Sequence, residues 1–78
     1  MLILAALLAL VEVHGPAHQR IFINPREITS LREPLAHDHF AKGTRCLIYL
    51  TNRNFIAVTE TCEHVRKLLL ANPWFASP

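Results

Sequence analysis

The N-terminal part of the chain alternates between apolar and polar residues, which is the pattern of a half-buried β-strand. Val11 and Val13 fall on one face of this segment, and Glu12 and His14 fall on the other. A Gly-Pro turn interrupts the alternation, and the apolar segment "RIFIN" follows it. The two segments therefore predict a β-hairpin with a loop of about five residues.

Three further segments have the composition of strands. The first surrounds Ile28 and Leu31, and the second, "TRCLIYLTN", is rich in β-branched and aromatic residues. Apolar residues on both of its faces indicate a central strand, or one that is covered by a helix or a partner. An Asn-Arg-Asn turn, predicted to be tight because asparagine tolerates positive φ, leads into the third segment, "FIAVTE". The two faces of the second segment hold Cys46, Ile48 and Leu50 on one side and Leu47 and Tyr49 on the other.

The C-terminal segment "TCEHVRKLLLANP" has helical periodicity. Thr61 is a natural N-cap, and Glu63 places negative charge in the first turn. Asn72 and Pro73 are expected to end the helix. The apolar stripe of this helix consists of Val65, Leu68 and Leu69.

These elements predict an α+β protein that is mainly β, with about five short antiparallel strands in a bent small sheet or partial barrel, followed by one C-terminal helix. The 78 residues allow one domain. We expect an apolar extension over residues 1–9, the β-rich domain with its helix over 10–72, and a tail over 73–78. The first apolar run ends at Glu12, short of the roughly 20 residues of a membrane-spanning helix, so we expect no transmembrane segment.

The two cysteines fall in a strand, at Cys46, and at the helix start, at Cys62. They could form one disulfide, but we expect two unpaired, buried thiols, because cysteine often behaves as a small core residue. Unpaired thiols favour a cytoplasmic location.

Five histidines raise the question of a metal site. Structural zinc needs four ligands in close pairs, and no Cys-x-x-Cys pair is present. We therefore expect surface histidines, no metal and no cofactor, with a three-histidine site built from two loops as the alternative. The close histidine pairs are His14 with His18 and His37 with His39.

Catalytic signals are weak. Cys62 and His64 are near in sequence, but no glycine-rich oxyanion loop accompanies them, and the two glycines cannot make a phosphate-binding loop. We expect a protein that is not an enzyme. The net charge of +2 is too small to indicate nucleic-acid binding by itself, although several spread arginines and exposed aromatic rings leave that alternative open.

The longest turn-like segment of the chain, residues 35–43, is the candidate binding site, because long loops often carry function. Gly43 is expected to supply a conformation that L-residues avoid, and Phe40 is expected to fold back over the core. The four expected contact residues are His37, His39, Phe40 and Lys42.

The chain resembles the small flagellar FlbD-like proteins over about residues 10 to 70. The matching pieces are Asn24-Pro25, Ile28, the strand "LIYLTN" and the segment "VTETCEHVRKLL". The resemblance implies a similar small β-rich fold and a link to flagellar or motility functions, and it carries no catalytic residue. This chain departs from the family pattern in its Asn-Arg-Asn turn, where the family favours Asn-Gly, and in its longer loop before the fourth strand.

A fainter likeness is to the carbon storage regulator family, whose small β-rich dimers bind RNA and also begin "MLIL". The basic residues that follow this start in the family are missing here. We expect a non-enzymatic protein-interaction module that self-associates or binds a protein partner by a sheet edge, its helix stripe or the histidine loop. The alternative is a small RNA-binding or other nucleic-acid-binding regulator.

Overall fold

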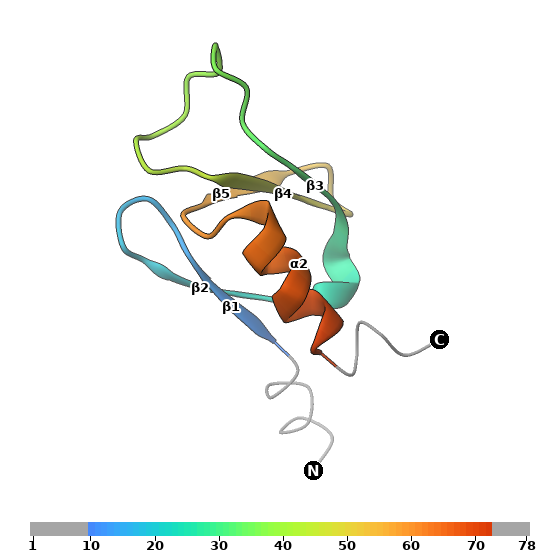
Figure 1. The fold of residues 1–78 in the computed structure, drawn as a ribbon. Helices are drawn as coiled ribbons and strands as arrows, with labels where there is room; N and C mark the ends of the chain where they lie inside the picture. Colours follow the sequence, from blue (N-terminus) through green and yellow to red (C-terminus); the bar gives the residue numbers. More distant parts are fainter. Residues whose placement is uncertain (1–9, 73–78) are drawn as a thin grey trace.

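Five strands and one helix follow one another in the order that the sequence predicts (Figure 1). The computed structural model describes residues 10–72, so the predicted N-terminal extension and C-terminal tail lie outside the described residues. The predicted fold class, α+β with mainly strands, is confirmed. The elements are β1 (Val11–His14), β2 (Arg20–Ile23), the 3-10 helix η1 (Pro25–Glu27), β3 (Ile28–Arg32), β4 (Cys46–Leu50), β5 (Phe55–Val58) and α2 (Cys62–Leu70).

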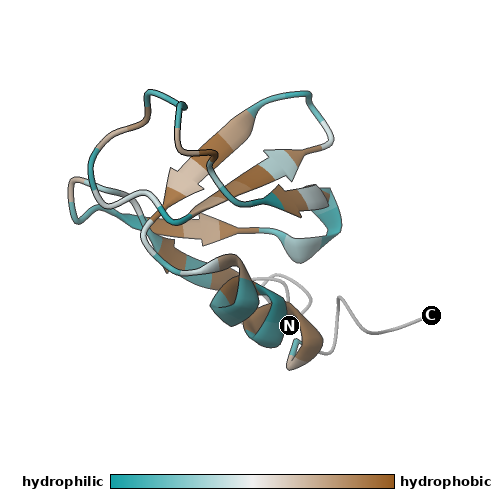
Figure 2. Cartoon of the chain, turned by 45° about the horizontal axis from the view of Figure 1, so that its top comes forward, coloured by the Kyte–Doolittle hydropathy of each residue, from teal (hydrophilic) through white to brown (hydrophobic). Residues whose placement is uncertain are grey.

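The strands form two antiparallel sheets rather than one (Figure 2). β1 and β2 make a hairpin, while β3, β4 and β5 make a three-stranded sheet with β4 in its centre. The sheets meet where the Thr59 N–H donates a hydrogen bond to the His14 carbonyl at 2.8 Å. The strands therefore bend around one core without closing into a barrel.

The core lies between the hairpin, the inner face of the three-stranded sheet and α2. Alternation in β1 buries Val11 and Val13 and leaves Glu12 exposed, as the sequence predicts. In β4, Cys46 and Ile48 face this core. The buried residues of the core cluster are Val11, Val13, Ile23, Cys46, Ile48, Val58, Val65 and Leu69.

The other face of the three-stranded sheet is also covered in part. Leu47 is fully buried, yet it does not belong to the core cluster, because it points to the opposite side of β4 from Cys46 and Ile48. The long loop between β3 and β4 contacts this outer face through Phe40. The prediction that β4 is a central strand is confirmed.

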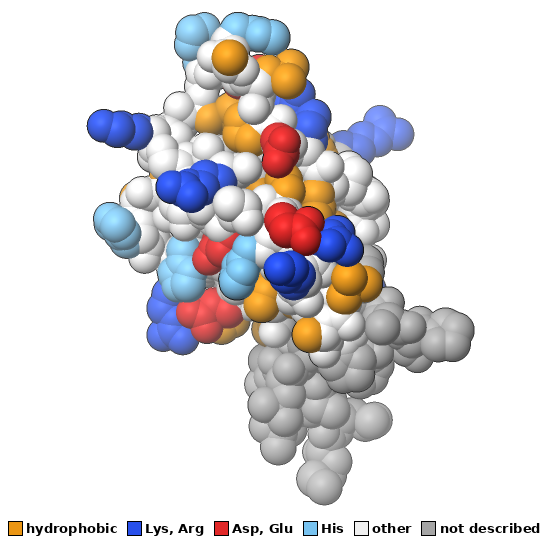
Figure 3. All heavy atoms as spheres, viewed as in Figure 1, with side chains coloured by type: hydrophobic (Ala, Val, Ile, Leu, Met, Phe, Trp, Pro, Cys, Tyr) orange, Lys and Arg blue, Asp and Glu red, His pale blue; other side chains and the backbone are white. Residues whose placement is uncertain are grey.

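Helix α2 begins and packs as its sequence predicts. The Thr61 hydroxyl accepts a hydrogen bond from the His64 N–H at 3.1 Å and so caps the first turn. Val65 and Leu69 are buried, and Figure 2 shows both apolar and polar colours around the helix. Charged side chains of both signs are mixed over the face of the molecule seen in Figure 3. With nine residues, α2 is too short to cross a membrane, and residues 10–72 contain no longer helix.

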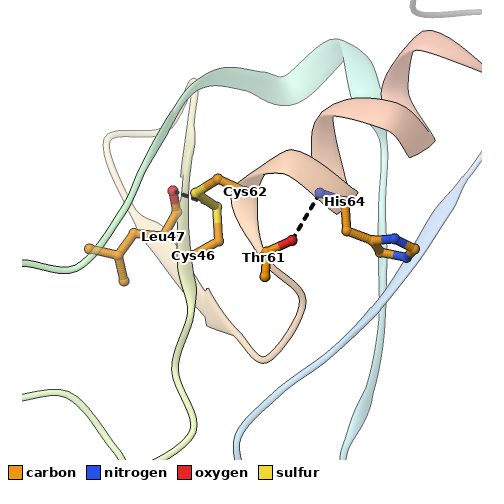
Figure 4. Close-up of a disulfide and its surroundings, with 5 residues drawn as sticks. All are labelled: Cys46, Leu47, Thr61, Cys62 and His64. Atoms are coloured by element: carbon orange, nitrogen blue, oxygen red, sulfur yellow. Dashed lines mark hydrogen bonds between the residues drawn. A yellow bond between two sulfur atoms is a disulfide. The ribbon is translucent and has the colours of Figure 1, made fainter.

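The prediction of unpaired thiols is wrong, because Cys46 and Cys62 form a disulfide (Figure 4). The first turn of α2 lies directly over the first residue of β4, and the two Cα atoms are 4.9 Å apart. This distance lies within the range that a disulfide requires. The sequence placed each cysteine in the correct element but did not reveal that the two elements meet at these residues.

The disulfide predicts a redox-dependent stability. It closes a segment with a sequence separation of 16, and the chain-entropy estimate for a loop of this size is about 3 kcal/mol. Adding a reductant should therefore lower the free energy of unfolding in urea by about this amount. The double variant Cys46→Ala/Cys62→Ala is the control, and its unfolding midpoint should not respond to the reductant. An unchanged midpoint of the parent protein in reductant would contradict a stabilising role.

The turn between β4 and β5 holds a strained residue at its centre. Arg53 has φ of 70°, in the left-handed region that a side chain disfavours, whereas the sequence suggested that an asparagine would take this role. Asn52 acts differently, because its Oδ1 accepts a hydrogen bond from the Asn54 N–H at 3.0 Å. The turn is thus held by Asn52 and strained at Arg53.

This difference predicts opposite effects for two glycine substitutions in one turn. Arg53→Gly removes the steric cost and should stabilise the protein by about 0.5–1 kcal/mol, after the entropy cost of glycine is subtracted. Asn52→Gly removes a hydrogen bond without relieving strain and should destabilise it. Thermal unfolding of both variants is the measurement, and a destabilised Arg53→Gly variant would contradict the interpretation.

Candidate functional site

The loop between β3 and β4 contains all four predicted contact residues and stands away from the sheet in Figure 1. The side chains of His37, His39 and Lys42 are exposed, and that of Phe40 is half-buried. The loop therefore offers its polar residues to solvent and anchors itself by its aromatic residue.

The first half of the loop is held by Asp38. Its carboxylate accepts a hydrogen bond from the Leu35 N–H at 2.7 Å, and its own N–H donates to the Leu35 carbonyl at 3.0 Å. The same carboxylate lies 3.8 Å from the guanidinium of Arg32, at the end of β3. Asp38 thus builds a tight turn that places His37 and His39 on its two sides.

The second half of the loop turns at Gly43. The Thr44 N–H donates to the Ala41 carbonyl at 3.1 Å, and Gly43 has φ of 95°. The prediction that Gly43 takes a conformation that L-residues avoid is confirmed. This turn brings the chain back to the sheet at the start of β4.

Phe40 folds back as expected, but onto the outer face of the sheet and not onto the core cluster. Its ring packs edge-on against Phe55 of β5, with 5.7 Å between ring centroids. Phe55 in turn stacks on Tyr49 of β4 at 5.5 Å. Phe40 therefore does not cover the core cluster, because side-chain alternation places both Tyr49 and Phe55 on the opposite face of the sheet.

The guanidinium of Arg32 completes this row, 5.9 Å from the centre of the Tyr49 ring. We call Arg32, Tyr49, Phe55 and Phe40 the aromatic ladder. It crosses β3, β4 and β5 and ends in the loop. Phe55 remains 47% exposed within it, so the ladder is a surface feature as well as an anchor for the loop.

The sequence alone did not predict the aromatic ladder, although the predicted hairpin was sufficient to pair two of its residues. Tyr49 and Phe55 lie symmetrically about Asn52, so the predicted hairpin pairs them on one face. The contribution of Phe40 depends on how the long loop folds, and no local pattern encodes that. Arg32 depends on the register of β3 against β4, which is shifted by an irregularity between Ile28 and Ser30.

The three strands of this sheet carry positive charge but no negative charge. Strands β3, β4 and β5 contain no Asp or Glu between them. Arg32 ends β3, and Arg45 directly precedes β4. The Asp38 carboxylate beside Arg32 is used in the loop turn. The outer face therefore combines aromatic rings with positive charge.

A separate polar cluster joins the two sheets around His14. Its N–H donates to Glu60 Oε1 at 2.9 Å, and its Nδ1 lies 2.7 Å from Glu60 Oε2. Its Nε2 lies 3.4 Å from Glu12 Oε2, and the Arg20 guanidinium donates to the same oxygen at 3.0 Å. The cluster attaches the hairpin to the connection between β5 and α2, so its role is structural.

The environment of Glu60 lowers the pKa of its carboxyl. Burial raises this pKa, but hydrogen bonds from the His14 side chain and backbone N–H outweigh that effect. For Glu12, the hydrogen bond from Arg20 is the main cause of a lowered pKa. Both carboxylates are thus held in the charged form that the cluster needs.

The residues considered for metal binding and catalysis do not assemble. In the described part of the chain, no group of three or more His, Cys, Asp or Glu side chains is placed to hold a metal ion. His14 is engaged by Glu60, while His18 is exposed in the hairpin loop. Cys62 is bonded to Cys46, so it offers no free thiol beside His64.

Comparison with models of known protein families, with curated proteins and with solved structures finds no match.

The Glu60 attachment predicts a stability that depends on pH. A carboxyl with a lowered pKa stabilises the fold above its unfolded value near 4.5 and loses this effect as the pH falls through the folded value. Glu60→Gln should lower the free energy of unfolding by about 1–2 kcal/mol at pH 7, and the difference from the parent should shrink below about pH 4.

Urea unfolding at pH 7 and pH 3 measures this effect. Glu63→Gln is the matched control, because Glu63 is exposed and pairs with Arg66 along the helix. It should cause a smaller loss. Equal losses for Glu60→Gln at both pH values would contradict the attachment.

Proposed function

We propose that this chain is a small non-enzymatic interaction module that binds a protein partner through the aromatic ladder and the loop between β3 and β4. The observation that carries the proposal is the exposed ring of Phe55, set between Tyr49 and the loop residue Phe40. Tyr, Phe and Arg are enriched at the centres of protein interfaces, and the ladder consists of these three residue types.

The loop supports the proposal because it is held before any partner arrives. Asp38 fixes one turn, Gly43 the other, and Phe40 anchors the segment between them. A loop ordered in advance loses less conformational entropy on binding. Three side chains, those of His37, His39 and Lys42, would then provide polar contacts at the rim of the aromatic surface.

The cellular setting of the module is a further part of the proposal. A role in flagellar or motility functions rests on the resemblance to FlbD-like proteins. A cytoplasmic location rests on unpaired thiols, and the disulfide weighs against it, because disulfides persist mainly in oxidising compartments.

Nucleic acid is the second candidate, favoured by the combination of aromatic rings and arginines on a face without strand carboxylates. Single-stranded nucleic acids bind such surfaces by stacking their bases on aromatic side chains. We favour a protein partner, because Tyr49 and Phe55 already stack on each other and Arg32 is paired with Asp38.

A peptide selection tests the proposal. The full chain is immobilised, peptides are selected from a random library, and the affinity of the enriched peptides is measured. Phe55→Ala should weaken binding roughly tenfold or more, as expected for an aromatic hot spot. Phe22→Ala is the matched control, because Phe22 is 54% exposed but belongs to the hairpin.

Two results would contradict a protein partner at this surface: enrichment of no peptide, or equal losses for both variants. Titration of a short single-stranded RNA at low and moderate salt distinguishes the second candidate. Binding that weakens steeply with salt and is lost in Phe55→Ala would assign the ladder to nucleic acid instead.

A further inference from the structure

Strand β5 lies at the edge of its sheet without the features that usually protect an edge. The strand order is β3-β4-β5, so β5 has no second neighbour among the described strands. Its sequence, Phe-Ile-Ala-Val, contains no charge and no proline, and its register with β4 is regular. Unprotected edges of this kind readily pair with another strand.

The opposite edge of the same sheet is different. β3 follows Pro25 and ends at Arg32, and its register with β4 shifts between Ile28 and Ser30. Such irregularities and charges reduce pairing with a further strand. The two edges are therefore unequal, and β5 is the one suited to association.

The direction of the β5 backbone groups follows from its pairing with β4. The Leu50 N–H donates to the Asn54 carbonyl at 2.9 Å, so Asn54 faces β4. In an antiparallel pair, alternate residues face the partner strand, so Ile56 faces β4 while Phe55 and Ala57 direct their backbone groups outward. Thr59 continues this alternation, because its N–H turns away from β4 and donates to His14.

We propose that a second copy of this chain pairs with β5 in antiparallel orientation, about a twofold axis at Ile56. Phe55 of each copy then exchanges two backbone hydrogen bonds with Ala57 of the other, and the two sheets join into one of six strands. A twofold contact of this kind is closed, so the product is a dimer and not a filament.

The side chains suit this register. Residues opposite each other in antiparallel strands share one face, so the large ring of Phe55 lies over the small methyl group of Ala57 of the second copy. The pairing extends over residues 54–58 and stops there, because the outward N–H of Thr59 already donates to the His14 carbonyl of its own chain. The pairing uses the β5 backbone, so it goes beyond the proposed binding of a partner by the ladder.

Sedimentation and light scattering of the full chain, from low micromolar to near-millimolar concentration, test the proposal. The expected result is a monomer–dimer equilibrium. Ala57→Lys places a charge against the apposed Phe55 and should weaken dimerisation roughly tenfold or more. Ser30→Lys is the matched control, because Ser30 is exposed on the same face but on β3, and it should dimerise like the parent.

Hydrogen exchange of the unaltered chain provides a second measurement, in case Ala57→Lys does not fold. The amides of Phe55 and Ala57 should exchange rapidly in dilute solution and slowly in concentrated solution, because only the dimer occupies them. The amide of Ile56, which faces β4, should be protected at both concentrations.

Three outcomes would overturn the proposal: a monomer at every concentration, open-ended larger assemblies, or a dimer that Ala57→Lys leaves intact. Protection of Phe55 and Ala57 that is independent of concentration would also overturn it. Peptide binding at the ladder in a chain that stays monomeric would leave the proposed function standing while the dimer fails.

Discussion

The apolar residues on both faces of β4 are the constraint on which the rest of the structure depends. Cys46, Leu47 and Ile48 are all fully buried, so the strand needs cover on two sides. The hairpin and α2 supply it on one side, and on the other side the long loop contacts the sheet through Phe40, which packs on Phe55. A domain of this size has only a small core, so the loop contributes to the packing as well as to the surface.

Local pattern was sufficient to predict the elements, because alternation, turn residues and the Thr61 cap are encoded by neighbouring residues. What the sequence did not reveal was contact between distant segments. The disulfide joins a strand to a helix, and the cluster at His14 joins residues 46 apart in the chain. The same limit applies to the site, where the predicted contact residues lie in the loop between β3 and β4 but the ladder depends on tertiary packing.

Two residues near the start of α2 attach it to the rest of the fold, and the two attachments differ in kind. At one end of the connection to α2, Glu60 holds the hairpin through hydrogen bonds that depend on protonation. Just beyond, Cys62 holds β4 through a covalent bond that depends on redox conditions. The start of α2 is therefore the point at which both sheets and the helix are joined.

The disulfide also determines how the chain would respond to cleavage by a protease. Arg53 is exposed at the tip of the turn between β4 and β5, where a trypsin-like enzyme would cut. Cys46 lies before this point and Cys62 lies after it, so the two fragments would remain bonded to each other. The two fragments of a nicked molecule would separate only after reduction, and β4 and β5 could stay paired across the cut.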